Sequence, residues 1–289
     1  MAWVEVILQG ALLGGLYALF AAGLSLAFGI MRIVNLAHGD FIVLSAYVAL
    51  VLAQGIGLHP LATIPLVVII MGGAGYLLQR GRLNRVLGDD IMPPLLVTFG
   101  ISVILQNLLL EIFSADTKGL QAGSLTTASL HIGAGLSIGW LPLLTLGIAV
   151  AVIAGVQLLL ARTPLGLAFR ATSDDQTTAR LMGIDTRHIY GLAMAIALAV
   201  VAIAGILFAM RTTFDPASGP SRLIFAFEAV IIGGMGSLWG TLAGGIILGV
   251  TQAIGFAIAP GIGLLFGHLA FLLVLSIRPQ GLFPRTHGG

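Results

Sequence analysis

Nine long runs of apolar residues divide the chain, and they restrict it to a membrane fold. A helix that spans a bilayer needs about 20 predominantly apolar residues; several of the runs are long enough, whereas the run 224–238 is short. Charged residues make up 8% of the sequence, against about 25% in soluble domains. The sequence therefore predicts an all-α integral membrane protein, a polytopic bundle of about eight to ten transmembrane helices in a single domain, 1–289. The runs are 8–29, 36–53, 61–78, 91–112, 138–161, 189–210, 224–238, 242–259 and 262–277.

Residues 162–187 reverse this apolar character. A charge at the bilayer centre costs roughly 2.5–3.5 kcal/mol even on translocon insertion scales, so we expect this region to lie in water. The four arginines among its charges place it in the cytoplasm by the positive-inside rule. The charged residues are Arg162, Arg170, Asp174, Asp175, Arg180, Asp185 and Arg187.

The remaining arginines extend this topology. Clusters at 80–85 and 278–285 predict a second cytoplasmic loop and a cytoplasmic C-terminus. The N-terminus and the connection 113–137 then lie on the periplasmic side. The loop that holds Arg211 and Arg222 also falls outside, which is a mild violation of the rule.

Several kinds of chemistry are missing from the sequence. Cysteine is absent, which removes disulfides, thiolate metal sites and cysteine nucleophiles. The single lysine, Lys118, does not stand in a phosphate-binding loop, so any ATP that drives this chain binds to another polypeptide. We therefore predict a non-catalytic membrane subunit with no catalytic residue, metal or cofactor of its own. A net charge of +2 set by so few residues does not indicate nucleic acid as a partner.

The region 162–187 contains the pattern of a short surface helix. Ser173 can cap its start, Asp174 and Asp175 suit its positive end, and Gly183 can end it in the left-handed conformation. Ala179 and Met182 would share one face. A helix of about ten residues is marginal in water unless it packs against something. The helix pattern alone leaves two possibilities open, a helix that a partner protein holds or a connector folded back on its own membrane domain.

Two interruptions break the apolar runs. Asn35 and His38 lie between the first two runs and would share a helix face. The segment 233–237 holds three glycines in four residues, each costing about 1 kcal/mol inside a helix. Broken backbone at membrane depth must face protein or water, so we expect both segments to approach a translocation path. The predicted path residues are Asn35, His38, Asp40, Gly233, Gly234, Gly236 and Ser237. The glycine spacing of 236, 240, 244, 245 and 249 indicates close helix packing.

These motifs, in this order, resemble the permease subunits of bacterial ABC importers for branched-chain amino acids, specifically the shorter of their two permeases. Residues 35–40 (NLAHGD) look like that family's Asn-(Phe/Leu)-Ala-His-Gly-acid motif, and the glycine-rich segment 226–245 and the C-terminal segment 278–283 (RPQGLF) are similar to family segments. The cytoplasmic loop matches the family's ATPase-docking loop at Gly166, Arg170, Ala171, Asp174, Ala179, Gly183 and Ile184. Leu167, where the family often has arginine, and Glu228 are departures.

The resemblance implies that residues 162–187 form a coupling loop gripped by cytoplasmic ATP-binding subunits. It also implies a second permease subunit, a periplasmic substrate-binding protein and a location in the bacterial inner membrane. The implied substrates are leucine, isoleucine and valine, or closely related small amino acids and amides. For an apolar substrate side chain we expect a mostly aliphatic path, with Asn35 and His38 fixing helix ends by hydrogen bonds.

One alternative from another class is a self-sufficient channel or proton-coupled carrier for a small polar solute such as urea. Its support is a set of ionisable residues in or near the apolar runs, which are functional suspects in a membrane. Our topology places His38 and Asp40 near the cytoplasmic boundary and Glu111 near the outer one, where they can be solvated. Only Glu228 is expected to lie deep.

Overall fold

The computed structural model describes residues 2–88, 90–132 and 136–283. Eight helical stretches in this part of the chain are long and apolar enough to cross a membrane, which confirms the predicted polytopic α-helical fold. Their main helices are α1 (Ala2–Met31), α2 (His38–Ile56), α3 (Ile64–Gly81), α4 (Met92–Phe113), α6 (Trp140–Arg162), α9 (Thr186–Arg211), α11 (Leu238–Ile258) and α12 (Gly263–Ile277).

Shorter elements connect these helices. They are the helices α5 (Ser124–Thr127), α7 (Pro164–Asp174), α8 (Gln176–Leu181) and α10 (Gly219–Gly233), and the single turns η1 (Pro60–Thr63), η2 (Leu83–Arg85) and η3 (Pro260–Ile262). The predicted run 224–238 falls largely in α10, which at 15 residues spans about 22 Å, less than the roughly 30 Å core of a bilayer.

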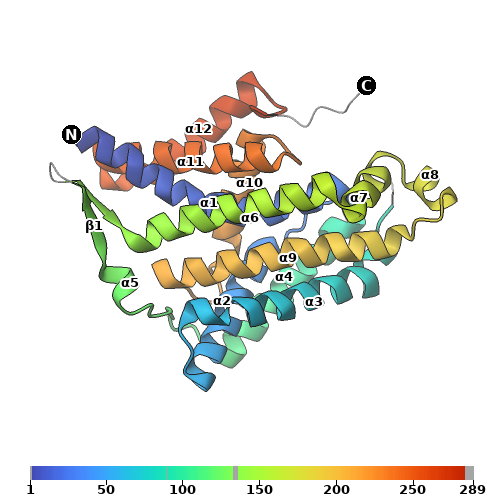
Figure 1. The fold of residues 1–289 in the computed structure, drawn as a ribbon, viewed down its shortest axis with the longest axis horizontal. Helices are drawn as coiled ribbons and strands as arrows, with labels where there is room; N and C mark the ends of the chain where they lie inside the picture. The colour runs from blue at the N-terminus through green and yellow to red at the C-terminus, as the bar shows by residue number, and fades with distance from the viewer. Residues whose placement is uncertain (1, 89, 133–135, 284–289) are drawn as a thin grey trace.

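The connections gather at two opposite ends of the bundle (Figure 1). At the end with the N-terminal residues, Gln9 donates to the Ser137 carbonyl and Lys118 pairs with Phe214 in an isolated β-bridge. At the end with α7 and α8, Asn84 donates to the Arg187 carbonyl. The C-terminal segment joins this second end up to residue 283, where the described part stops, so the predicted Arg285 lies outside it. The described connections are thus divided between the two ends of the bundle in the way that the positions of the arginines predicted.

The connection 113–137 holds a feature that the sequence did not predict. Strands β1 (Ser129–Ile132) and β2 (Leu136–Gly139) pair antiparallel, with Leu130 opposite Ile138. We had placed Ile138 at the start of an apolar helical run, but α6 begins at Trp140. Apolar and β-branched residues favour either state in a short run, and here the pairing partner decides the local structure.

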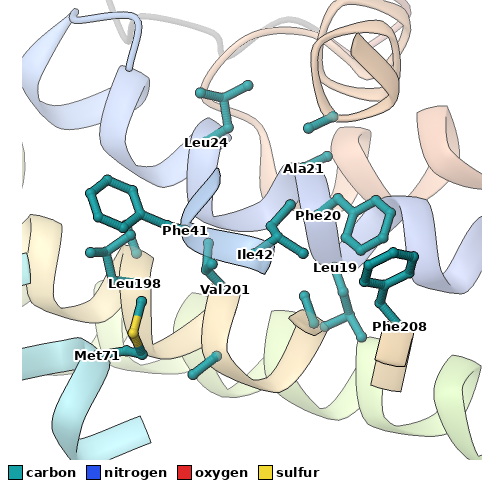
Figure 2. Packing of buried hydrophobic residues seen from close by; sticks show 14 of the residues in the cluster. Leu19, Phe20, Ala21, Leu24, Phe41, Ile42, Met71, Leu198, Val201 and Phe208 are labelled. Atoms are coloured by element: carbon teal, nitrogen blue, oxygen red, sulfur yellow. The ribbon is translucent and has the colours of Figure 1, made fainter. Parts of the chain in front are cut away.

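The core lies around α1, which packs against α6, α9, α10 and α11. Figure 2 shows Leu19 and Phe20 of α1 among side chains of α2 and α9 such as Ile42 and Phe208; all four are 1% exposed or less. The helices α4, α6 and α12 instead leave apolar faces outside, as Leu273 (62% exposed) illustrates, which suits contact with lipid or another membrane subunit.

Close glycine contacts tie α11 to α1. A methyl group at Gly249 would lie 2.3 Å from the Gly10 carbonyl oxygen, and one at Gly245 would lie 2.7 Å from the Gly14 carbonyl oxygen. The hydrophobic effect does not drive helices together in lipid, so they associate through the close packing that such small residues allow. The predicted role of the glycine spacing in close packing is confirmed.

Candidate functional site

The first interruption lies between α1 and α2. Helix α1 ends at Met31, Arg32 takes a left-handed backbone (φ 54°), and α2 begins at His38. The Asn35 side-chain oxygen accepts from the Ala37 amide at 3.0 Å. Asn35 therefore precedes the helix, and the prediction that it shares a helix face with His38 is wrong. Asparagine competes for nearby backbone amides in this way, which favours a turn over a helix.

His38 lies deep in the bundle rather than at its boundary. It donates its Nε2 hydrogen to the Phe20 carbonyl at 2.7 Å, and both His38 and Asp40 are 1% exposed. Phe20 precedes the end of α1 by 11 residues, or about 16 Å of helix. The chain folds back after α1, so α2 starts beside the middle of its neighbour. The expected boundary position of His38 and Asp40 is wrong. Asn35 fixes a helix end by a hydrogen bond as expected, whereas the His38 side chain binds a carbonyl in the middle of α1.

Asp40 marks a meeting point of three helices. Its Oδ2 accepts from Ser102 of α4 at 2.5 Å, and Gln106 donates to the same hydroxyl at 3.1 Å. Next to it, Gly39 packs so tightly on the start of α10 that an added methyl carbon would lie 2.0 Å from the Gly219 carbonyl oxygen. The carboxylate thus lies in the first turn of α2 and beside the first turn of α10. The positive ends of both helices favour an anion there.

The second interruption separates α10 from α11. Gly234 (φ 106°) and Gly236 (φ 81°) adopt backbone conformations that favour glycine, and Ser237 caps α11 by accepting from the Gly240 amide at 3.2 Å. The C-terminal segment is tied to this break, since the Phe283 amide donates to the Gly233 carbonyl at 3.0 Å. The predicted break of the helix is confirmed.

The two interruptions do not form one site. Residues 35–40 lie at the start of α10 and residues 233–237 at its end, so the predicted path residues are divided along this helix. The second interruption instead borders a cavity of about 360 Å³ that also reaches Arg170 of α7. Its lining is Ser25, Leu26, Gly29, Ile30, Gln157, Leu160, Ala161, Phe169, Arg170, Gly236, Ser237, Leu238 and Trp239.

The predicted docking helix is two helices. Thr163 caps α7, and Asp175 caps α8 by accepting from the Thr177 and Thr178 amides at 2.8 and 3.0 Å. These hydrogen bonds, above all those from the side chain and the amide of Thr178, lower the pKa of Asp175. Ser173 is therefore no cap, and that prediction is wrong. Gly183 does adopt the left-handed conformation, with φ 86°.

Ser173 has a different task at the end of α7. Its hydroxyl donates to the Gly29 carbonyl at 2.9 Å, and the Arg32 guanidinium donates to the Ser173 carbonyl at 3.4 Å. Asp174, predicted at the start of a helix, is the last residue of α7 and is exposed. The end of α7 is thus attached to the end of α1, immediately before the first interruption.

The predicted docking residues differ in exposure. Gly166 is buried against the backbone of Leu160, whose carbonyl also accepts from Arg170, and Ala179 is 3% exposed. Ala171 and Ile184 are half-buried. The side chains that protrude are Leu181 (83% exposed) and Met182 (78%), and the region around α8 extends beyond the other helices in Figure 1. Met182 therefore does not share the buried face of Ala179, and the prediction that the two residues share one face is wrong.

A polar cluster between α1, α10, α11 and α12 escaped the sequence analysis. The Tyr17 hydroxyl donates to Gln252 Oε1 at 2.7 Å, and Glu228 Oε1 pairs with His268 Nδ1. Arg222 lies over the Phe208 ring, 4.5 Å from its centre. Glu228 is 4% exposed, so the expectation that it lies deep is confirmed. Glu111 is exposed near the end of α4, also as predicted.

Comparison with known proteins places this architecture in a family. Residues 6–276 match the family of the permease component of branched-chain amino acid transport systems. The high-affinity branched-chain amino acid transport system permease protein BraD of Pseudomonas aeruginosa is 29% identical over 98% of this chain and 96% of its own length. A probable branched-chain amino acid transport permease protein, LivH of Methanocaldococcus jannaschii, is 29% identical over 96% of this chain and 92% of its own.

More distant matches cover similar lengths. The permease protein LivM of Escherichia coli K12 is 28% identical over 99% of this chain and 73% of its own length. Among solved structures, PsaBC from Streptococcus pneumoniae in complex with Fab is 18% identical, with a TM-score of 0.49 over 95% of this chain and 92% of that one. Because the family match spans almost the whole sequence, including both interruptions and the α7–α8 region, the chain belongs to the family of branched-chain amino acid transport permease components.

Proposed function

We propose that this chain is a permease subunit of an ATP-driven importer that moves branched-chain amino acids, or closely related small amino acids and amides, across the bacterial inner membrane. The whole chain, 1–289, would form one permease domain beside a second permease subunit. A periplasmic binding protein would deliver the substrate, and cytoplasmic ATP-binding subunits would dock on residues 162–187. The observation that carries this proposal is the family match over residues 6–276.

The arrangement of the two ends supports an orientation. The α7–α8 end holds most of the arginines, including Arg162 and Arg187, and the opposite end holds the β1–β2 hairpin. By the positive-inside rule the α7–α8 end faces the cytoplasm. The N-terminus then faces the periplasm and the C-terminus the cytoplasm. The exposed apolar pair Leu181 and Met182 suits burial against an ATPase, because apolar side chains gain most from leaving water.

We likewise assign the docking residues and path residues of the sequence analysis to these roles. Of the docking set, Gly166, Arg170 and Ala179 would act by holding α7 and α8 in place. Of the path set, Gly236 and Ser237 border the cavity beside α7, which supports a position near the cytoplasmic exit.

Reconstitution tests the proposal. The chain is purified with a second permease, two ATP-binding subunits and a periplasmic binding protein of the same host, and leucine uptake into proteoliposomes is measured with internal or external ATP. We expect uptake only with ATP on the side of the α7–α8 loop and with the binding protein on the other side. The matched control is the chain alone, which should neither hydrolyse ATP nor move leucine. Flux through the chain alone under a proton gradient would establish the carrier alternative instead.

A further inference from the structure

Two arginines of the polar cluster lack an anionic partner. Arg222 stands in the first turn of α10 and Arg211 at the end of α9, and both are half-buried. Within residues 2–88, 90–132 and 136–283, the side chain of Arg222 makes no hydrogen bond, and its Nε is shielded from solvent. Arg211 makes one long hydrogen bond, to the Leu12 carbonyl at 3.4 Å. A partly buried guanidinium without an anion is costly, because its charge has lost part of its hydration.

Asp215, which precedes α10, forms no ion pair with either arginine within the described residues. Its Oδ1 accepts from the Ala217 amide at 2.8 Å and its Oδ2 from the Ser218 hydroxyl at 3.0 Å. It therefore shapes the turn before α10. The contact of Arg222 with the face of Phe208 uses none of the five N–H donors of the guanidinium. Those donors remain available to a ligand.

A carboxylate lies on the inner side of the same cluster. Glu228 follows Arg222 by six residues on α10, a rise of about 9 Å. One of its oxygens pairs with His268, but the other, Oε2, is buried with no hydrogen-bond partner. Aromatic rings connect the two charged side chains. Arg222 lies over Phe208, and Phe20 contacts both Phe208 and Tyr17. His268, the partner of Glu228, stacks on Phe225 with ring centres 6.5 Å apart. The aromatic side chain of Phe225 stacks on Tyr17 there, with ring centres 5.0 Å apart.

We propose that this cluster is a binding site for the charged backbone of an amino acid in transit. Arg222, assisted by Arg211, binds the α-carboxylate, and the free oxygen of Glu228 faces the α-ammonium group. The aromatic rings between the charges accept the aliphatic side chain. This inference rests on the proposed function, because it assumes that the transported solute is an amino acid.

The location also fits the direction of import. Arg211 lies at the end of the bundle that carries the β1–β2 hairpin, which the proposed orientation places outside. A substrate released there meets the arginines first and Glu228 afterwards. Glu228 and α10 then lead toward the second interruption and the cavity beside α7.

The test uses binding of leucine and of leucinamide, which lacks the carboxylate. Saturation-transfer NMR on the reconstituted complex, without the binding protein, measures both affinities. A charge-assisted hydrogen bond changes affinity by about 10- to 100-fold, so we expect the complex to prefer leucine by this factor. R222Q should remove the preference. R222K should weaken it at least about threefold, since lysine keeps the charge but loses the two-pronged contact. R82Q, at an exposed position near η2, is the matched control and should retain it.

Any of four results would overturn the inference. One is a complex that takes up leucine but binds leucinamide equally well, and another is R222Q with an unchanged preference. Assembly of R222Q is judged by the ATP hydrolysis that liganded binding protein stimulates. If R222Q does not assemble, an unchanged preference for leucine in R222K overturns the inference instead. If the unaltered complex takes up no leucine at all, the proposed function fails first and this inference fails with it.

Discussion

Replacing Gly39 with alanine should separate the starts of α2 and α10. The added methyl carbon would lie 2.0 Å from the Gly219 carbonyl oxygen and 2.8 Å from the Leu223 amide nitrogen, whereas real contacts of this kind stay beyond 3.0 Å. Both neighbours are backbone atoms, so one helix must move by about 1 Å. Overpacking of this kind costs roughly 1–3 kcal/mol, and the better helix propensity of alanine offsets up to about 1 kcal/mol of that.

Gly73→Ala is a matched control inside α3. Nothing lies within 4 Å of the position where its methyl carbon would stand, so only the propensity gain of about 1 kcal/mol remains. Unfolding in mixed micelles with rising SDS, followed by circular dichroism, should give a lower midpoint for Gly39→Ala than for the unaltered chain. The midpoint of Gly73→Ala should be equal or higher. If both alanine variants unfolded at the same SDS fraction, the tight crossing of α2 and α10 would be refuted.

Three further changes probe the α7–α8 region and the second interruption. Ser173→Ala removes a hydrogen bond worth about 0.5–1.5 kcal/mol between α7 and α1, and leucine uptake per ATP hydrolysed should fall while hydrolysis persists; unchanged stoichiometry would contradict this link. Gly183→Val strains a left-handed position by about 1–3 kcal/mol and should weaken co-purification of the ATPase. The pKa of Asp175 is lowered in the folded chain. Its helix cap is therefore complete above the unfolded pKa of about 3.9 and is lost only as pH falls through the lower folded value. Co-purification of the ATPase with the unaltered chain should accordingly be constant from pH 5 to 8. In this cysteine-free chain, Ser237→Cys should react with hydrophilic thiol reagents and change its rate when ATP is trapped, whereas Val150→Cys on the outer face of α6 should not change.

Periodic and compositional signals predicted the membrane fold well. Apolar runs and clustered arginines act over one segment at a time, and each segment must satisfy its own backbone inside the bilayer. The break at 233–237 was also predictable, because its glycines act locally. The polar cluster was not, since Tyr17 and Gln252 stand 235 residues apart. The available signals were Glu228, which was expected to lie deep, and Arg211 and Arg222, which fell on the side where the positive-inside rule expects few arginines.

The error in the docking loop has a related cause. Thr163, Ser173 and Asp175 are all good helix caps, and the sequence does not rank them. The structure selects Thr163 and Asp175, because the Ser173 hydroxyl is engaged with the Gly29 carbonyl of α1. A long-range contact therefore decided where a local pattern was ambiguous.

That same contact indicates how movement of the loop would reach the interior. Gly29 of α1 and Arg32, which follows α1, are each attached to Ser173 by one hydrogen bond. Six residues after Arg32 the chain enters α2 at His38, which is fixed to the middle of α1. A partner that displaces α7 would therefore act on the end of α1 while His38 holds the start of α2. The strain would concentrate in residues 33–37, which lie outside both helices. Because Gly39 presses directly on Gly219, any shift of α2 passes to α10, the helix that carries Arg222 and Glu228. A rigid-body displacement of these packed helices is thus a sufficient link from the docking loop to the polar cluster.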